Sequence, residues 1–141
     1  MKESRIIADY DHWPLAVWRF DDDNYTDDEV MRWLTEDVGK ALQRNEPFGV
    51  IQDMKETLST ISQRSMAAKF VKENREPFQN LLAAAYVVDS RAVRGIITAI
   101  FWMVPPPYPY KVFAKVGDAI DWVSAQLKKA GITPPKLEPW R

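Results

Sequence analysis

The sequence predicts an α/β domain in the order β-β-α-β-α-β-α-β-α, with a mixed five-stranded sheet and four helices. Three observations lead to this prediction. Short runs of β-forming residues recur along the 141 residues, segments with apolar residues at helical spacing lie between them, and capping signals precede several of these segments. An opening strand pair followed by alternating helices and strands is typical of an α/β sheet with right-handed crossovers.

The strands are expected at residues 6–10, 15–20, 48–51, 83–88 and 110–113. The first two are separated only by a four-residue turn, which favours an antiparallel pair. This turn contains His12, the one histidine of the chain. No nucleophile motif accompanies it, so we expect a turn or packing role. The fourth strand is apolar throughout, which predicts burial on both faces of the sheet.

The first two helices carry recognisable start signals. Thr26 and Glu29 have the spacing of a capping box, and apolar residues follow them with a period of 3.6 residues. The second helix is expected to begin near Ser62, because Ile61 and Met66 have the spacing of a hydrophobic staple.

The third helix is expected to follow Asp89 and Ser90 and is apolar on nearly all sides. Such a helix is either deeply buried or part of an interface with a partner. The fourth is expected over residues 116–130, and Gly131 follows it as a C-terminal cap. Residues 1–131 are therefore predicted to form a single domain, and residues 132–141, with three prolines, a C-terminal tail.

Composition excludes several classes of function. Nineteen basic and 20 acidic residues give a net charge of −1, without the basic excess of a nucleic-acid-binding protein. Cysteine is absent, so no disulfide, thiolate metal site or cysteine nucleophile is expected. The longest apolar run is too short to span a membrane, and no signal-peptide pattern opens the chain. We therefore expect a cytoplasmic protein with no cofactor, no metal, no membrane span and no nucleic-acid partner.

Three segments carry a resemblance to a known fold group: Tyr10–Leu15, Tyr86–Gly95 and Pro105–Phe113. Together with the element order, they resemble the SpoIIAA-like superfamily, whose fold is shared by STAS domains, and a group of small uncharacterised bacterial proteins of that fold. The resemblance covers residues 5–130. It implies a STAS-like domain, and STAS domains often bind partner proteins.

The resemblance also implies a possible phosphorylation site, because STAS domains of anti-sigma systems are switched at a serine that opens the helix after the third strand. The matching stretch here is Asp53 to Ser65. It departs from the family pattern, since the Asp-Ser-Ser-Gly-like sequence and its glycine are missing. Ser59 and Ser62 are the best candidates, because a phosphate at a helix N-terminus gains backbone N–H donors.

The candidate site lies where strands end and helices begin, which is where α/β sheets bind ligands. Asp89 and Ser90, with Arg91 and Arg94, form one cluster that could hold an anion. Asp53 ends the third strand on the same edge and could pair with Arg91 or Arg94. The plain structural alternative is a helix cap, surface ion pairs and a loop carboxylate.

Aromatic residues supply a second candidate surface. Tyr108 lies in the proline-rich loop beside the apolar third helix, and such a loop could dock a partner or a second copy of the chain. Core packing is the other interpretation for four tryptophans on or near the inner faces of predicted elements: Trp18, Trp33, Trp102 and Trp122.

The sequence contains no catalytic constellation, Gly-rich phosphate loop or dinucleotide fingerprint. The function expected first is therefore a non-enzymatic, regulatory protein-interaction module with another protein as partner, and a homodimer is compatible with it. The alternative is a carrier or sensor of a small apolar or anionic ligand, suggested by the apolar third helix.

Overall fold

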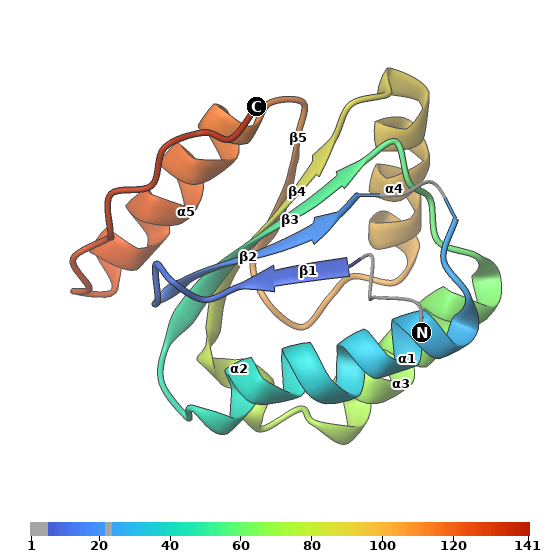
Figure 1. Cartoon of the computed structure of the whole chain (residues 1–141), viewed down its shortest axis with the longest axis horizontal. Helices are drawn as coiled ribbons and strands as arrows, with labels where there is room; N and C mark the ends of the chain where they lie inside the picture. The colour runs from blue at the N-terminus through green and yellow to red at the C-terminus, as the bar shows by residue number, and fades with distance from the viewer. Residues whose placement is uncertain (1–5, 22–23) are drawn as a thin grey trace.

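The computed structural model describes residues 6–21 and 24–141. Its centre is a five-stranded sheet whose strands lie side by side in chain order (Figure 1). The first pair is antiparallel and the other neighbouring pairs are parallel. The strands are β1 (Ile6–Asp9), β2 (Leu15–Phe20), β3 (Phe48–Lys55), β4 (Leu81–Val88) and β5 (Tyr110–Phe113). The predicted α/β class, element order and mixed five-stranded sheet are confirmed.

Helices cover both faces of the sheet, as Figure 1 shows. Right-handed crossovers that each advance one strand in the same direction place their helices on one face, and α5, which follows the edge strand, lies on the other. The first helix is continuous through a π-helical segment. The helices are α1 (Asp27–Arg32), π-helical η1 (Trp33–Val38), α2 (Gly39–Gln43), α3 (Ile61–Glu73), the 3-10 helix η2 (Pro77–Asn80), α4 (Arg91–Met103) and α5 (Val116–Lys129).

Each face of the sheet has its own apolar core. Successive residues of a strand point to opposite faces. Val50 therefore joins the core under α1 to α4, and its neighbour Ile51 joins the core under α5. Both residues are fully buried. The strand predicted at residues 83–88 is buried along its whole length, as expected for a central strand covered on both sides.

The start of α3 differs from the prediction. Thr60 caps the helix through a capping box with Gln63, so Ile61 is already its first residue. Ile61 is 76% exposed, and the staple predicted between Ile61 and Met66 is therefore wrong. A threonine with glutamine three residues later gives two reciprocal hydrogen bonds, and this signal decides where the helix begins.

Helix α4 is not deeply buried. Ile97 is its one buried residue. Trp102 is 87% exposed, so the core position predicted for it is wrong, whereas Trp18 and Trp33 are buried as predicted. Trp122 is half-buried against the α5 core. The apolar pattern of α4 correctly predicted a helix with apolar residues on nearly all sides. It did not indicate whether those residues are buried or exposed.

The C-terminal segment, residues 132–141, contains no helix or strand. Ile132, Leu137 and Trp140 nevertheless pack against the core under α5. In Figure 1 the segment runs back along α5 and ends near the carboxyl ends of the central strands. This path carries the last two residues to the candidate site.

Candidate functional site

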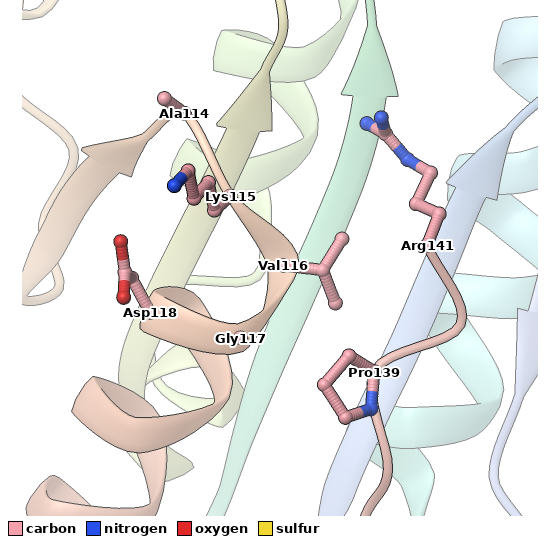
Figure 2. Close-up of a pocket in the computed structure, with 7 residues that line it drawn as sticks. All are labelled: Ala114, Lys115, Val116, Gly117, Asp118, Pro139 and Arg141. Atoms are coloured by element: carbon pink, nitrogen blue, oxygen red, sulfur yellow. The ribbon is translucent and has the colours of Figure 1, made fainter.

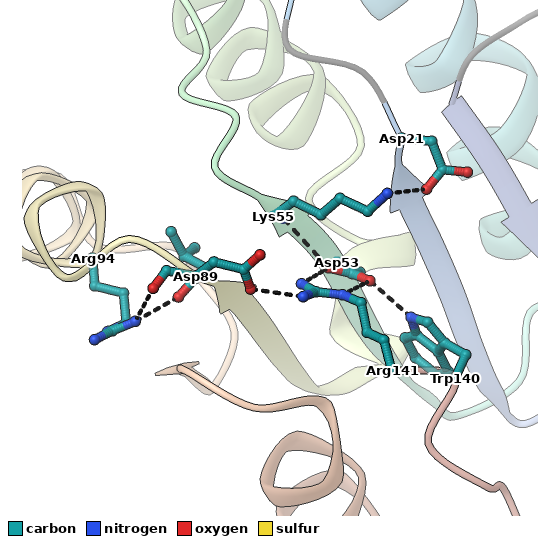
Figure 3. Close-up of polar contacts among 8 residues, drawn as sticks. Asp21, Asp53, Lys55, Asp89, Arg94, Trp140 and Arg141 are labelled. Atoms are coloured by element: carbon teal, nitrogen blue, oxygen red, sulfur yellow. Dashed lines mark hydrogen bonds and ion pairs between the residues drawn. The ribbon is translucent and has the colours of Figure 1, made fainter.

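Asp53 and Asp89 lie together where two neighbouring parallel strands end. Asp53 is near the end of β3, and Asp89 directly follows β4. The backbone amide of Asp89 donates to the carbonyl of Lys55 at 2.7 Å, which fixes the two ends next to each other. The sequence placed both carboxylates on the same edge, and the structure brings them together around Arg141 (Figure 3). We call this pair and its surroundings the Asp53–Asp89 site.

The carboxylate of Asp53 is completely buried and accepts four hydrogen bonds. Arg141 donates two of them, from Nε to Oδ2 at 2.9 Å and from a terminal guanidinium nitrogen to Oδ1 at 2.6 Å. The indole N–H of Trp140 donates to Oδ2 at 2.7 Å, and the backbone amide of Lys55 donates to Oδ1 at 3.3 Å. The other terminal nitrogen of Arg141 bonds Asp89 at 2.7 Å. One guanidinium thus joins both carboxylates.

The electrostatics follow from these contacts. Burial raises the pKa of Asp53, but the hydrogen bonds from Arg141 and Trp140 outweigh it and hold the pKa below its usual value. The hydrogen bonds between Arg141 and Asp53 act in the opposite direction on Arg141 and raise its pKa. The pair is therefore charged at neutral pH, and this charged state depends on the last two residues of the chain.

The arginines predicted to pair with Asp53 do not do so. Arg94 donates from one nitrogen to the backbone carbonyls of Val88 and Asp89, both at 2.8 Å, and so closes the end of β4 (Figure 3). Arg91 is exposed. Ser90 caps α4 by accepting from the amide of Val93, which confirms its structural role as a cap.

Ser59 and Ser62 lie elsewhere: Ser62 is at the contact between α3 and α1, and Ser59 lies just before α3. The hydroxyl of Ser62 donates to the carboxylate of Asp27 at 3.0 Å. The carbonyl of Ser59 accepts from Arg64 within α3. These serines are therefore not partners of the Asp53–Asp89 site, and a phosphate on Ser62 would meet the carboxylate of Asp27.

The residues that complete the site were missed from the sequence. Trp140 and Arg141 stand 87 and 88 positions after Asp53, in a segment without periodicity. The available signal was a tryptophan and an arginine side by side in a proline-rich stretch. Nothing in that stretch indicates which carboxylate they reach.

A second surface is the exposed side of α4. We call Ile96, Trp102, Met103 and Val104 the α4 face, because these four large apolar residues are all exposed. No charged residue occurs from Gly95 to Tyr110, an unusual composition for a helix at the surface.

Tyr108, in the proline-rich loop beside α4, packs partly against the core. The hydroxyl of Tyr108 is hydrogen-bonded to that of Tyr86 at 2.8 Å, and its ring stacks on Phe78 with 5.9 Å between centroids. Burial raises the pKa of Tyr108. Tyr108 is therefore half-buried at the edge of the core, where its hydroxyl and that of Tyr86 satisfy each other.

An open pocket of about 420 Å³ lies between the start of α5 and the C-terminal segment (Figure 2). Lys115, which precedes α5, and Asp118, within α5, line one side of the pocket. Pro139 and Arg141 line the other side from the tail. Its charged groups have both signs. Arg141, whose guanidinium bonds Asp53 and Asp89, is one of the residues that line it.

Comparison of the chain with protein-family models, curated proteins and solved structures gave no match. Among the described residues, no helix has both the length and the apolar character needed to cross a membrane.

Proposed function

We propose that the chain is a non-enzymatic protein-interaction module that docks on a partner through the α4 face. The observation that carries this proposal is the exposure of Trp102, at 87%, together with Met103 and Val104. Contiguous apolar side chains on a folded domain are typical of interaction surfaces, and tryptophan is enriched among residues that contribute most to binding.

The absence of charge supports the same proposal. An uncovered surface helix normally carries charged residues on its solvent side. Helix α4 has none after Arg94, so its outer side is suited to contact another apolar surface. We further propose that the domain is STAS-like. The order of strands and helices and the mixed sheet support that assignment, and STAS domains often act by binding other proteins.

The test is affinity capture with the tagged full chain from a lysate of its source organism. Trp102→Glu places a charge on the α4 face at its most exposed residue, and we expect it to abolish retention of a stoichiometric partner. Ile61→Glu is the matched control, because Ile61 is nearly as accessible as Trp102 but lies on α3, where a glutamate suits the helix N-terminus.

Loss of the partner with Trp102→Glu and its retention with Ile61→Glu would support the α4 face as the contact. A partner retained equally by all three proteins would contradict it. The partner bound through the α4 face could also be a second copy of the chain. In that case light scattering would give a doubled mass for the wild type and for Ile61→Glu, and the mass of one chain for Trp102→Glu.

A further inference from the structure

The Asp53–Asp89 site has the composition of a receptor for an arginine side chain. Asp53 is fully buried, so its charge requires a cation and hydrogen-bond donors in place of water. The other nearby basic groups are engaged elsewhere. Lys55 pairs with Asp21 at 3.1 Å, and Arg94 bonds backbone carbonyls. Within the described part of the chain, Arg141 is the side chain that supplies the positive charge to both carboxylates.

The geometry selects a guanidinium over an ammonium. Two N–H groups of Arg141 meet the two oxygens of Asp53 in parallel, and a third meets Asp89. Only a flat group with several donors in a fixed fork makes all three bonds at once. The indole of Trp140 completes the site with a bond to the same carboxylate, so an aromatic residue before the arginine adds a further contact.

The occupant can be reached from solvent. The side chain of Arg141 is 31% exposed, and Asp89 is exposed to a similar extent. The segment that carries Arg141 has no helix or strand of its own, and the open pocket beside it is lined by Pro139 and Arg141. The carboxyl ends of parallel strands are also the usual place of ligand binding in α/β sheets.

We propose that Asp53 and Asp89 form a binding site for an arginine that follows an aromatic residue in an unstructured segment of a partner protein, and that Trp140 and Arg141 are its internal occupant. The partner segment binds when it displaces the chain's own tail. The tail is therefore an intramolecular competitor. Its effective concentration at the site is that of a short tether, on the order of 1 mM. This site is distinct from the α4 face and does not depend on it.

The test uses the full chain with Trp140→Ala and Arg141→Ala combined, which empties the site without removing the segment. The probe is acetyl-tryptophanyl-arginine amide, and the matched probe carries lysine in place of arginine. Binding is measured by calorimetry, with circular dichroism as the check of folding. We expect the arginine probe to bind the double variant about tenfold more tightly than the lysine probe does, because lysine lacks the fork of donors. We expect the wild type, with its tail bound, to bind the arginine probe at least about tenfold more weakly than the double variant does.

Equal binding of the two probes, equal binding by wild type and variant, or no binding would each overturn the proposal. If the double variant does not fold, Arg141→Gln in the full chain takes its place, with acetyl-arginine amide and acetyl-lysine amide as probes. We then expect the arginine probe to bind about tenfold more tightly than the lysine probe, and the absence of this preference overturns the proposal. Trp102→Glu leaves all of these affinities unchanged, which separates this site from the α4 face.

Discussion

A buried carboxylate such as that of Asp53 is stable only if other groups replace the water that it loses. Three of its four hydrogen bonds come from Trp140 and Arg141. Removing one partner of a buried ion pair leaves an uncompensated charge, which costs more than the pair itself contributes. The folded state therefore depends on the tail through this single side chain.

Arg141→Gln should lower the free energy of unfolding at pH 7 by about 3 kcal/mol, because Asp53 then remains buried without its cation. Lys136→Gln removes the same charge from an exposed position of the same segment and should change stability by less than about 0.5 kcal/mol. Urea denaturation of the three proteins measures both values. A similar effect of the two substitutions would show that the loss of net charge, and not the bond to Asp53, is responsible.

The pH dependence of these proteins should differ in sign. In the wild type the pKa of Asp53 is lowered on folding, so its stabilising effect is complete above an unfolded pKa of about 3.9 and is lost as the pH falls through the folded value. In Arg141→Gln burial acts without the guanidinium and raises that pKa, so protonation favours the folded state. The difference in Tm between the two proteins should therefore shrink from pH 7 to about pH 4. A difference that is constant over this range would contradict the assignment.

At the scale of elements, the sequence correctly predicted two helix starts that are set by neighbouring residues. The capping box at Thr26 and the cap at Ser90 start α1 and α4 as predicted. The prediction failed where a distant segment decides the outcome. No local pattern pairs Asp53 with Arg141, and the apolar pattern of α4 does not reveal that Trp102 lies at the surface. Contacts between residues far apart in sequence leave no periodic signal.

The packing of α5 on the sheet depends on a glycine in β3. A Cβ at Gly49 would lie 2.5 Å from a methyl carbon of Val123, a fully buried residue of α5. Gly49→Ala should therefore destabilise the protein by about 1–3 kcal/mol, because the strand or the packed side chain of Val123 must shift to admit the methyl group.

Gly95→Ala in α4 is the matched control. Nothing lies within 4 Å of a Cβ at this position. Alanine replaces glycine in a helix interior here, so stability should rise by about 0.5–1 kcal/mol. Thermal denaturation followed by circular dichroism compares the two variants. Equal effects of the two substitutions would show that α5 does not approach β3 as closely as the structure has it.

At the scale of the whole molecule, α5 covers its face of the sheet together with the last ten residues. The core on that face is closed at its margin by the half-buried side chains of Ile132, Leu137 and Trp140. The other face is covered by several helices. The tail therefore adds apolar contacts where one helix is too narrow to cover the strands, and the same contacts deliver Arg141 to the ends of β3 and β4.

Leu137→Ala should consequently lower the free energy of unfolding, although Leu137 lies in no helix or strand. A half-buried leucine contributes less than a fully buried one, so we expect a loss of about 1–2 kcal/mol. Lys136→Ala, at the exposed neighbouring position, should stay within about 0.5 kcal/mol of the wild type. Chemical denaturation measures both, and amide hydrogen exchange of residues 132–141 adds an independent readout. If Leu137→Ala were neutral and these amides exchanged as fast as in a free peptide, the tail would not be part of the folded unit, and Asp53 would need another partner.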